Sequence, residues 1–214
     1  MIVSPSILSA DFGYLAKDLE MLENSKAGLV HVDIMDGVFV PNISFAFPIL
    51  KRVNELTKLP LDVHLMIVEP QKYIQNVKDC GGDIMTVHYE ACVHLHRVIQ
   101  QIKDAGMKAG VAINPSTPVC LLSEVLCDID IVCIMSVNPG FPAQKFISNT
   151  LNKIKELKEL IVQKGAKTKI EVDGGINEKT GALVAEAGAD IVVAGSYVFN
   201  ANDPLDSVEK LYNL

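Results

Sequence analysis

Eight short apolar segments recur along the chain, and longer stretches with a polar face separate them. Each segment has four to six residues and most are rich in valine and isoleucine, which is typical of strands buried on both faces of a parallel sheet. The predicted strands are 2–7, 29–34, 61–66, 84–88, 108–113, 131–135, 169–172 and 191–194. The stretches 12–25 and 150–165 carry apolar residues three and four positions apart, which predicts helices. The chain is therefore predicted to alternate between strand and helix.

This alternation fits two folds, an open doubly wound sheet and a (β/α)8 TIM barrel. Eight units within 214 residues favour the barrel. No Gly-x-Gly-x-x-Gly motif follows the first strand, which disfavours the dinucleotide-binding form of the open sheet. Because no linker or low-complexity segment divides the chain, we expect one barrel domain over residues 1–214.

Composition limits the binding partners and the cellular location that we expect for this protein. Hydrophobic residues make up 49% of the chain and the formal net charge is -7, which favours a packed globule without nucleic-acid or anionic-membrane partners. The five cysteines show no Cys-x-x-Cys spacing, so we expect reduced thiols rather than disulfides. We see neither a signal peptide nor an uncharged run of about 18 residues that could span a membrane. The expected location is the cytoplasm.

Ionisable side chains stand out at the carboxyl ends of three predicted strands, where TIM barrels place their chemistry. His31 and Asp33 are two residues apart, so both can point into the barrel. His64 lies near the end of the third strand and Asp173 follows the seventh. Two imidazoles and two carboxylates suit a divalent transition metal. A buried hydrogen-bonded cluster without metal is the alternative reading.

Glycines follow the last two predicted strands. Gly174 and Gly175 come after the seventh, and Gly195 and Ser196 after the eighth. Loops at these places form the phosphate site of many TIM barrels, because glycine lets the backbone approach an anion closely. The sequence therefore predicts a phosphate site here.

Five other residues lie near the same mouth. Met35, Met66 and Met135 lie at or just past strand ends, where they form either an apolar lining over a substrate or ordinary core. Asp36 is expected to cap a turn. His88, at the end of the fourth strand, also faces the mouth by position.

Several motifs together closely resemble the ribulose-phosphate 3-epimerase family. They are SPSILSADF, HVDIMDGVFVPNISF, LDVHLMI, MSVNPGF and EVDGGIN, and the resemblance runs from about residue 2 to residue 200. It implies a TIM barrel of the ribulose-phosphate-binding type, which inverts C3 of D-ribulose 5-phosphate to give D-xylulose 5-phosphate in the pentose phosphate pathway. It also implies one divalent ion (zinc, iron, manganese or cobalt), a small sugar-phosphate substrate and a homo-oligomer, either a dimer or a hexamer.

The resemblance also implies roles for individual residues. His31, Asp33, His64 and Asp173 would hold the metal, and Asp33 and Asp173 would be the two acid/base groups. The substrate would contact Ser6, His64, Gly140, Phe141, Pro142, Ala143, Gly174, Gly175, Gly195 and Ser196. Removing the C3 proton leaves an enediolate, whose charge a metal would stabilise. Inversion needs proton carriers on opposite faces, and strands 2 and 7 would supply one each.

The chain departs from the family pattern in two places. The family loop Pro-Gly-Phe-Gly-Gly-Gln has Pro142 and Ala143 in place of its later glycines, and Ala46 stands where relatives commonly have glycine. Proline has no N–H to donate to phosphate, and alanine resists a positive φ. The loop is thus expected to be either stiffened but working, or weaker in phosphate binding.

Three other functions compete with this prediction. A D-allulose 6-phosphate 3-epimerase would share the fold, the metal and the bases. A barrel decarboxylase or aldolase would carry Asp-x-Lys-x-x-Asp, whereas this chain has His64 in place of the lysine. A binding protein without activity would be expected to lose proposed ligands, and all four are present.

Overall fold

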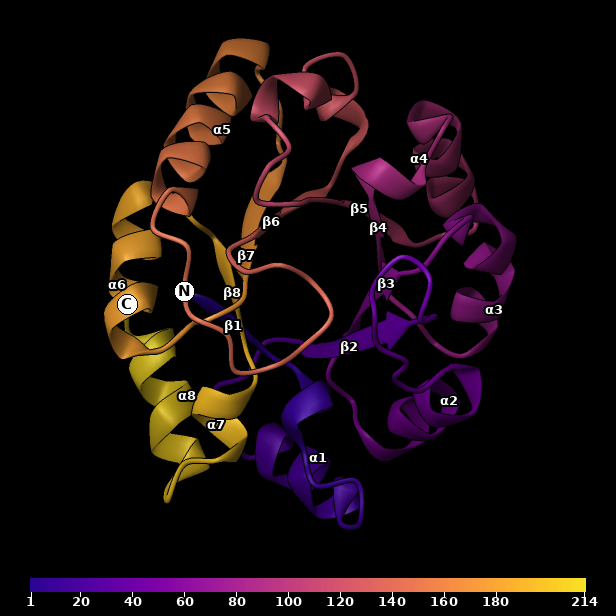
Figure 1. Ribbon diagram of the computed structural model, residues 1–214. Helices are drawn as coiled ribbons and strands as arrows, with labels where there is room; N and C mark the ends of the chain where they lie inside the picture. The colour runs from indigo at the N-terminus through magenta and orange to yellow at the C-terminus, as the bar shows by residue number, and fades with distance from the viewer.

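The computed structural model describes residues 1–214 as a ring of eight parallel strands surrounded by helices (Figure 1). The strands are β1 (Ile2–Pro5), β2 (Val30–Met35), β3 (Leu61–Met66), β4 (Ile84–His88), β5 (Lys108–Ile113), β6 (Ile131–Met135), β7 (Lys169–Asp173) and β8 (Ile191–Ala194). They pair in the order β1-β8-β7-β6-β5-β4-β3-β2, and one parallel bridge between Ser6 and His31 joins β1 to β2. The predicted (β/α)8 barrel is confirmed, and five of the strands have the predicted bounds.

Helices cover the outside of the ring. They are α1 (Leu15–Glu23), α2 (Phe47–Leu56), α3 (Ile74–Asp79), α4 (Leu95–Asp104), α5 (Thr150–Lys164), α6 (Glu178–Ala187), α7 (Ser196–Phe199) and α8 (Pro204–Tyr212). Between β5 and β6 the chain forms only two short 3₁₀ helices, Val119–Leu122 and Leu126–Asp128. Helix α5 ends at Gly165 with a left-handed φ of 63°, and Asn177 begins α6 with a capping box, so local sequence sets these boundaries.

The apolar core lies mainly between the strands and the helices, where 45 buried residues form one cluster. Along β2, Val30 and Val32 belong to this cluster, while the alternating His31 and Asp33 face inward. A small apolar cluster of Leu29, Ile84, Ile131 and Ile191 lies apart from the main core, at the amino ends of strands. Above this cluster lie buried polar side chains, among them His31, Asp62 and Glu171, beside a small apolar cluster of Ala112, Cys133 and Met135.

Three aspartates tie neighbouring strands together at the amino end. Each directly precedes an even-numbered strand and accepts a hydrogen bond from a backbone N–H of the strand before it. The pairs are Asp83 with Leu61, Asp130 with Ala109 and Asp190 with Ile170, at 2.8–2.9 Å. These carboxylates therefore act on the backbone.

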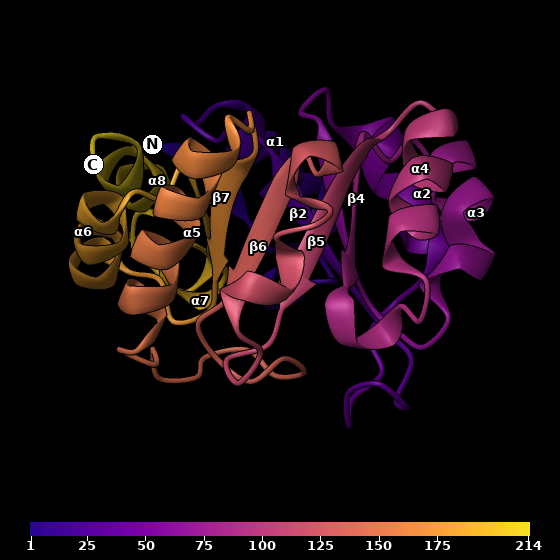
Figure 2. The ribbon, with the colours of Figure 1, turned by 90° about the horizontal axis from the view of Figure 1, so that it is seen from above.

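The opposite end carries the long loops. Figure 2 shows that the loops after β2 and β6 project from the same end of the barrel. Asp36 accepts hydrogen bonds from the N–H groups of Val38, Phe39 and Val68, so it caps the loop after β2 as predicted. No helix in the structure combines the length and hydropathy needed to cross a membrane.

Candidate active site

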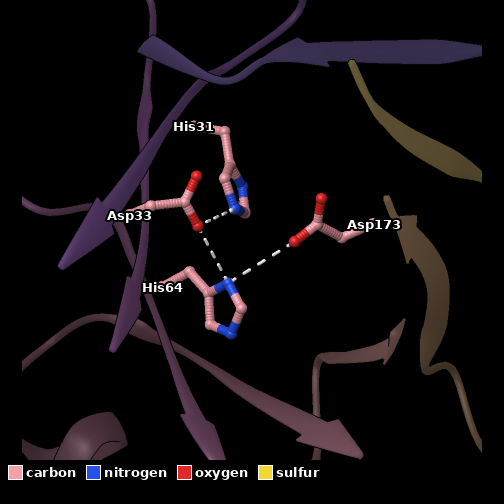
Figure 3. A group of neighbouring side chains, drawn as sticks. All are labelled: His31, Asp33, His64 and Asp173. Carbon is pink, nitrogen blue, oxygen red and sulfur yellow. Dashed lines mark hydrogen bonds and ion pairs between the residues drawn. The ribbon is translucent and has the colours of Figure 1, made fainter. Parts of the chain in front are cut away.

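Four predicted side chains meet inside the carboxyl end of the barrel (Figure 3). His31 and Asp33 come from β2, His64 from β3 and Asp173 from the end of β7. His64 Nδ1 lies 3.2 Å from Asp33 Oδ1 and 3.7 Å from Asp173 Oδ2. One ligand atom of each residue lies within 4.8 Å of the others. The predicted residues thus form a compact set of two imidazoles and two carboxylates.

His31 presents a free nitrogen to this cluster. Its Nδ1 lies 2.7 Å from Asp62 Oδ2, which leaves Nε2 facing Asp33 Oδ1 at 3.2 Å. Nε2 is buried and makes no hydrogen bond. Because a buried nitrogen without a partner is costly, this atom suits a metal ligand. The residues present therefore fit a divalent ion.

The charge around His31 leads to the same conclusion. Burial lowers the pKa of this imidazole, but Asp33 and Asp62 together outweigh burial and raise the pKa well above its usual value. The two carboxylates thus stabilise a positive charge at His31, either a proton or a metal ion. A proton and a metal ion would compete for Nε2, since a ligating nitrogen must be deprotonated.

Asp33 and Asp173 have opposite electrostatic surroundings. Burial acts to raise the pKa of Asp33, but His31 and His64 outweigh it and hold the pKa well below its usual range. Ser6 Oγ also donates to Asp33 Oδ2 at 2.5 Å. Burial, reinforced by the charge of Asp33, raises the pKa of Asp173 to about 6. Two nearby carboxyl groups with separated pKa values are the arrangement expected of an acid/base pair.

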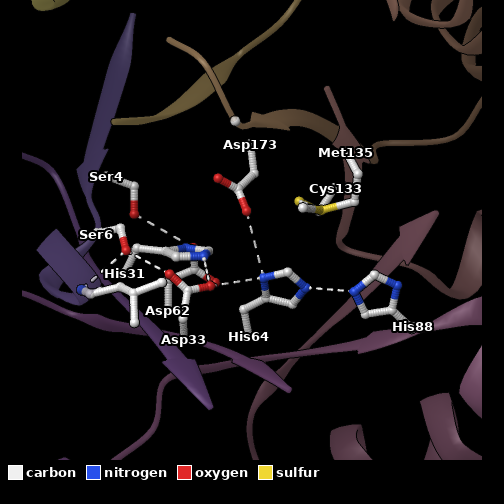
Figure 4. A network of polar contacts seen from close by, with 12 residues as sticks. Ser4, Ser6, His31, Asp33, Asp62, His64, His88, Cys133, Met135 and Asp173 are labelled. Carbon is white, nitrogen blue, oxygen red and sulfur yellow. Dashed lines mark hydrogen bonds and ion pairs between the residues drawn. The ribbon is translucent and has the colours of Figure 1, made fainter. Parts of the chain in front are cut away.

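Two further acidic residues, Asp62 and Glu171, lie nearer the amino ends of β3 and β7 than the predicted ligands (Figure 4 labels Asp62). Asp62 and Glu171 are fully buried, and burial together with the charge of Asp62 raises the pKa of Glu171 well above its usual value. Sequence reasoning missed both residues. Each stands two positions before a predicted ligand, His64 or Asp173, and so points the same way. This two-residue spacing is the sequence feature from which their inward direction could have been predicted.

His64 has a second imidazole on its far side. Its Nε2 lies 2.9 Å from His88 Nε2, and His88 Nδ1 lies 3.2 Å from Glu90 Oε2 (Figure 4 shows the two histidines). Burial lowers the pKa of His88 to about 4, so this imidazole is neutral at neutral pH. His88 ends β4 as predicted, but it is fully buried and contacts His64 rather than lining the open mouth. Glu90 was not foreseen.

A pocket opens above Asp33 and Asp173. Its lining includes the predicted residues Met35, Met66, Met135, Gly140, Phe141, Pro142, Ala143, Gly174, Gly175, Gly195 and Ser196. It also includes Ser9 and Gln144, which were not predicted. Ser6 and His64 are buried and lie outside this lining, and both contact Asp33.

Comparison with known proteins agrees with this geometry. A protein-family sequence model described as "Ribulose-phosphate 3 epimerase family" matches residues 2–199. The chain belongs to this family. A protein of Bacillus subtilis named ribulose-phosphate 3-epimerase is 51% identical over 210 residues, which cover 98% of this chain and 97% of that protein. A Synechocystis protein of the same name is 46% identical over 215 residues, covering 100% of this chain and 94% of that protein.

The fold is shared more widely than the sequence. The structure of orotidine 5'-phosphate decarboxylase from Pyrococcus horikoshii OT3 is similar with a TM-score of 0.72, covering 100% of this chain and 98% of that one. The sequences are 15% identical, so this similarity concerns the barrel alone. The family predicted from the motifs is confirmed by the family match and the curated relatives.

The glycines after β7 are required by the backbone. Gly174 and Gly175 have φ of 114° and 63°. A Cβ atom on Gly174 would lie 2.4 Å from Val137 Cγ2, and one on Gly175 would lie 2.7 Å from the backbone nitrogen of Phe146. The backbone N–H groups of Gly174, Gly175, Gly195 and Ser196 donate to no protein group. These free donors suit an anion.

The two departures from the family pattern have different consequences. Ala143 has a φ of 59°, a left-handed conformation that costs an alanine about 1–2 kcal/mol. Gln144 Nε2 donates to the carbonyls of Asn138 and Phe141, at 2.6 and 2.9 Å, and so holds the loop. Ala46 has a φ of -134°, which any residue adopts. Of the two alanines, only Ala143 has a strained backbone.

Proposed function

We propose that this chain inverts C3 of D-ribulose 5-phosphate to give D-xylulose 5-phosphate by two-base proton transfer through an enediolate. The observation that carries the proposal is the placement of Asp33 and Asp173. They extend from β2 and β7 toward the same nitrogen of His64, with pKa values shifted in opposite directions (Figure 3). Membership of the epimerase family supports this assignment.

One carboxyl group would remove a proton from one face of the substrate, and the other would deliver a proton to the opposite face. Asp33, which is ionised, removes the C3 proton alpha to the C2 carbonyl. Asp173, protonated, then delivers a proton to C3 from the opposite side. The net result leaves Asp33 protonated and Asp173 ionised, so the reverse reaction uses the same groups with exchanged roles. Ser6 holds Asp33 in place through its hydrogen bond.

We propose that His31, Asp33, His64 and Asp173 hold one divalent ion, since their ligand atoms fit one. When bound, such an ion would stabilise the negative charge that develops on the substrate oxygens. Nitrogen and carboxylate ligands suit zinc, iron(II), manganese or cobalt. The chain's own residues supply the proton carriers.

The rest of the pocket would orient the sugar phosphate. The free N–H groups of Gly174, Gly175, Gly195 and Ser196 would bind the phosphate at the ends of β7 and β8. Met35, Met66 and Met135 would pack against the sugar and exclude water near the two carboxyl groups. Pro142 supplies no N–H, so the loop after β6 would contribute fewer donors than the family pattern.

The test is proton NMR of D-ribulose 5-phosphate with the protein in deuterated water. We expect loss of the C3 proton signal and appearance of D-xylulose 5-phosphate, abolished by a chelator and restored by adding back the ion. Absence of exchange with zinc, iron(II), manganese or cobalt would overturn the proposal. D-allulose 6-phosphate in the same assay tests the hexulose alternative.

Two further expectations remain predictions. We propose a homo-oligomer, a dimer or a hexamer, which light scattering would measure. We also propose a cytoplasmic location.

A further inference from the structure

His64 is joined to a chain of two more side chains that the proposed reaction does not use. His88 Nε2 lies 2.9 Å from His64 Nε2, and the two rings are inclined by only 24° (Figure 4). This edge-to-edge contact is a hydrogen bond between imidazoles rather than a stack of ring faces. Phe39 packs against the His88 ring with centroids 4.6 Å apart, which restrains its rotation.

The direction of this hydrogen bond follows from valence. A neutral imidazole carries one N–H and one acceptor nitrogen. His64 faces Asp33 and Asp173 with Nδ1, so a metal ligand at that atom requires the proton on Nε2. Nε2–H of His64 must then donate to Nε2 of His88. His88 in turn carries its proton on Nδ1 and donates to Glu90 Oε2, 3.2 Å away.

Glu90 is held so that it can act only as an acceptor toward His88. Its other oxygen, Oε1, accepts hydrogen bonds from the backbone N–H of Asn114 at 2.8 Å and from the hydroxyl of Thr117. Both contacts come from the segment after β5, so the carboxylate is fixed from outside the metal cluster. The carboxylate thereby sets the donor-to-acceptor direction of both hydrogen bonds, from His64 to His88 and from His88 to Glu90.

We propose that His88 and Glu90 are positioning residues that fix the tautomer of His64 and so set the affinity of the metal centre. This inference rests on the metal centre proposed above. Neither residue touches the cluster of ligand atoms directly. They act by keeping the lone pair of His64 Nδ1 directed at the ion, as outer partners of ligating histidines generally do.

Replacing Glu90 with glutamine would reverse the direction of these hydrogen bonds while keeping the size and shape of the side chain. In Glu90→Gln, the amide oxygen would remain toward Asn114, because an NH2 group there would face an N–H donor. The NH2 group would then point at His88 Nδ1 and move the His88 proton to Nε2. His64 would have to accept at Nε2 and carry its proton on Nδ1, where it blocks the ion.

The experiment measures Co²⁺ affinity by competition with a chelator, without substrate, together with the visible absorption of the bound ion. We expect Glu90→Gln to weaken Co²⁺ binding about 10- to 100-fold. His88→Gln should remain within about threefold, because its amide oxygen can accept from His64 without Glu90. For the same reason, adding His88→Gln should restore most of the affinity lost in Glu90→Gln. Asp190→Asn, at the far end of the barrel, is the matched control.

Each outcome decides the inference. Equal Co²⁺ affinity in Glu90→Gln and the unmodified protein would overturn the proposed roles of His88 and Glu90. So would a double variant that binds Co²⁺ no more tightly than Glu90→Gln alone. Circular dichroism checks that each variant is folded. If Glu90→Gln is not folded, His88→Leu takes its place: it removes the acceptor at His64 Nε2 and should weaken Co²⁺ binding, and an unchanged affinity would overturn the proposal. Failure of the unmodified protein to bind Co²⁺ would overturn the metal centre itself.

Discussion

The two ends of the barrel differ in what their aspartates contact. At the amino end, Asp83, Asp130 and Asp190 each accept a backbone N–H from a neighbouring strand. At the carboxyl end, Asp33 and Asp173 face imidazoles instead, beneath an open pocket. A carboxylate that accepts one N–H can be replaced by another acceptor, whereas a carboxylate that carries charge and a proton cannot. The same residue type therefore accepts backbone hydrogen bonds at one end, and at the other it supplies the two carboxyl groups that we propose as proton carriers.

The largest effect is expected at the carboxyl end. Asp33→Asn or Asp173→Asn should lower turnover by at least about 10³-fold, because an amide can neither take nor deliver the C3 proton. The measurement is kcat for D-ribulose 5-phosphate, with the melting temperature as a control for folding. A variant that keeps a near-normal rate would contradict the two-base assignment.

A smaller effect should appear in stability against pH. Burial depresses the folded-state pKa of His88 to about 4, below the ordinary imidazole value of 6.5. The unfolded chain therefore binds the proton first, so stability contributed by neutral His88 is lost as the pH falls through this window. The loss should be about 2 kcal/mol at about pH 5.

Urea unfolding of the metal-free protein at two pH values checks this prediction. Between about pH 7 and pH 5 the unmodified protein should lose about 2 kcal/mol more than His88→Gln. The exposed His94 provides a matched control, since His94→Gln should leave the pH dependence unchanged. An equal loss in His88→Gln and the unmodified protein would show that His88 is not held neutral.

The smallest effect belongs to the amino end. Asp190→Ala leaves the N–H of Ile170 without its acceptor, which should lower the free energy of unfolding by about 1–2 kcal/mol. Asp190→Asn keeps an acceptor oxygen and should stay within about 0.5 kcal/mol of the unmodified protein. Both variants should retain kcat. A large loss of turnover in either would break the distinction between the two ends.

Much of the fold could be predicted from local pattern. The strand segments are short, rich in β-branched residues and bounded by turn residues, which is the pattern expected of strands buried on both faces. The helix ends at Gly165 and Asn177 follow from side-chain and backbone preferences that act within a few residues. The proposed ligands were found because strand alternation and position at a strand end both select them.

The outer partners of the proposed ligands could not be predicted in the same way. Asp62 meets His31 across 31 positions of sequence, and Glu90 meets Asn114 across 24. Such contacts depend on the shear of the barrel and the path of each loop. The positive φ of Ala143 is likewise a product of loop closure, since alanine by itself avoids that conformation.

The sequence by itself determined the alternation of strand and helix, the inward direction of His31, Asp33, His64 and Asp173, and the family motifs. Periodicity and local backbone preference suffice for these features, because they act within single elements. Only the tertiary structure decided which nitrogen of each histidine faces the cluster and how far the pKa values of Asp33 and Asp173 separate. Those properties arise when residues distant in sequence are brought together and shielded from water, which changes both their hydrogen-bond partners and the cost of their charge.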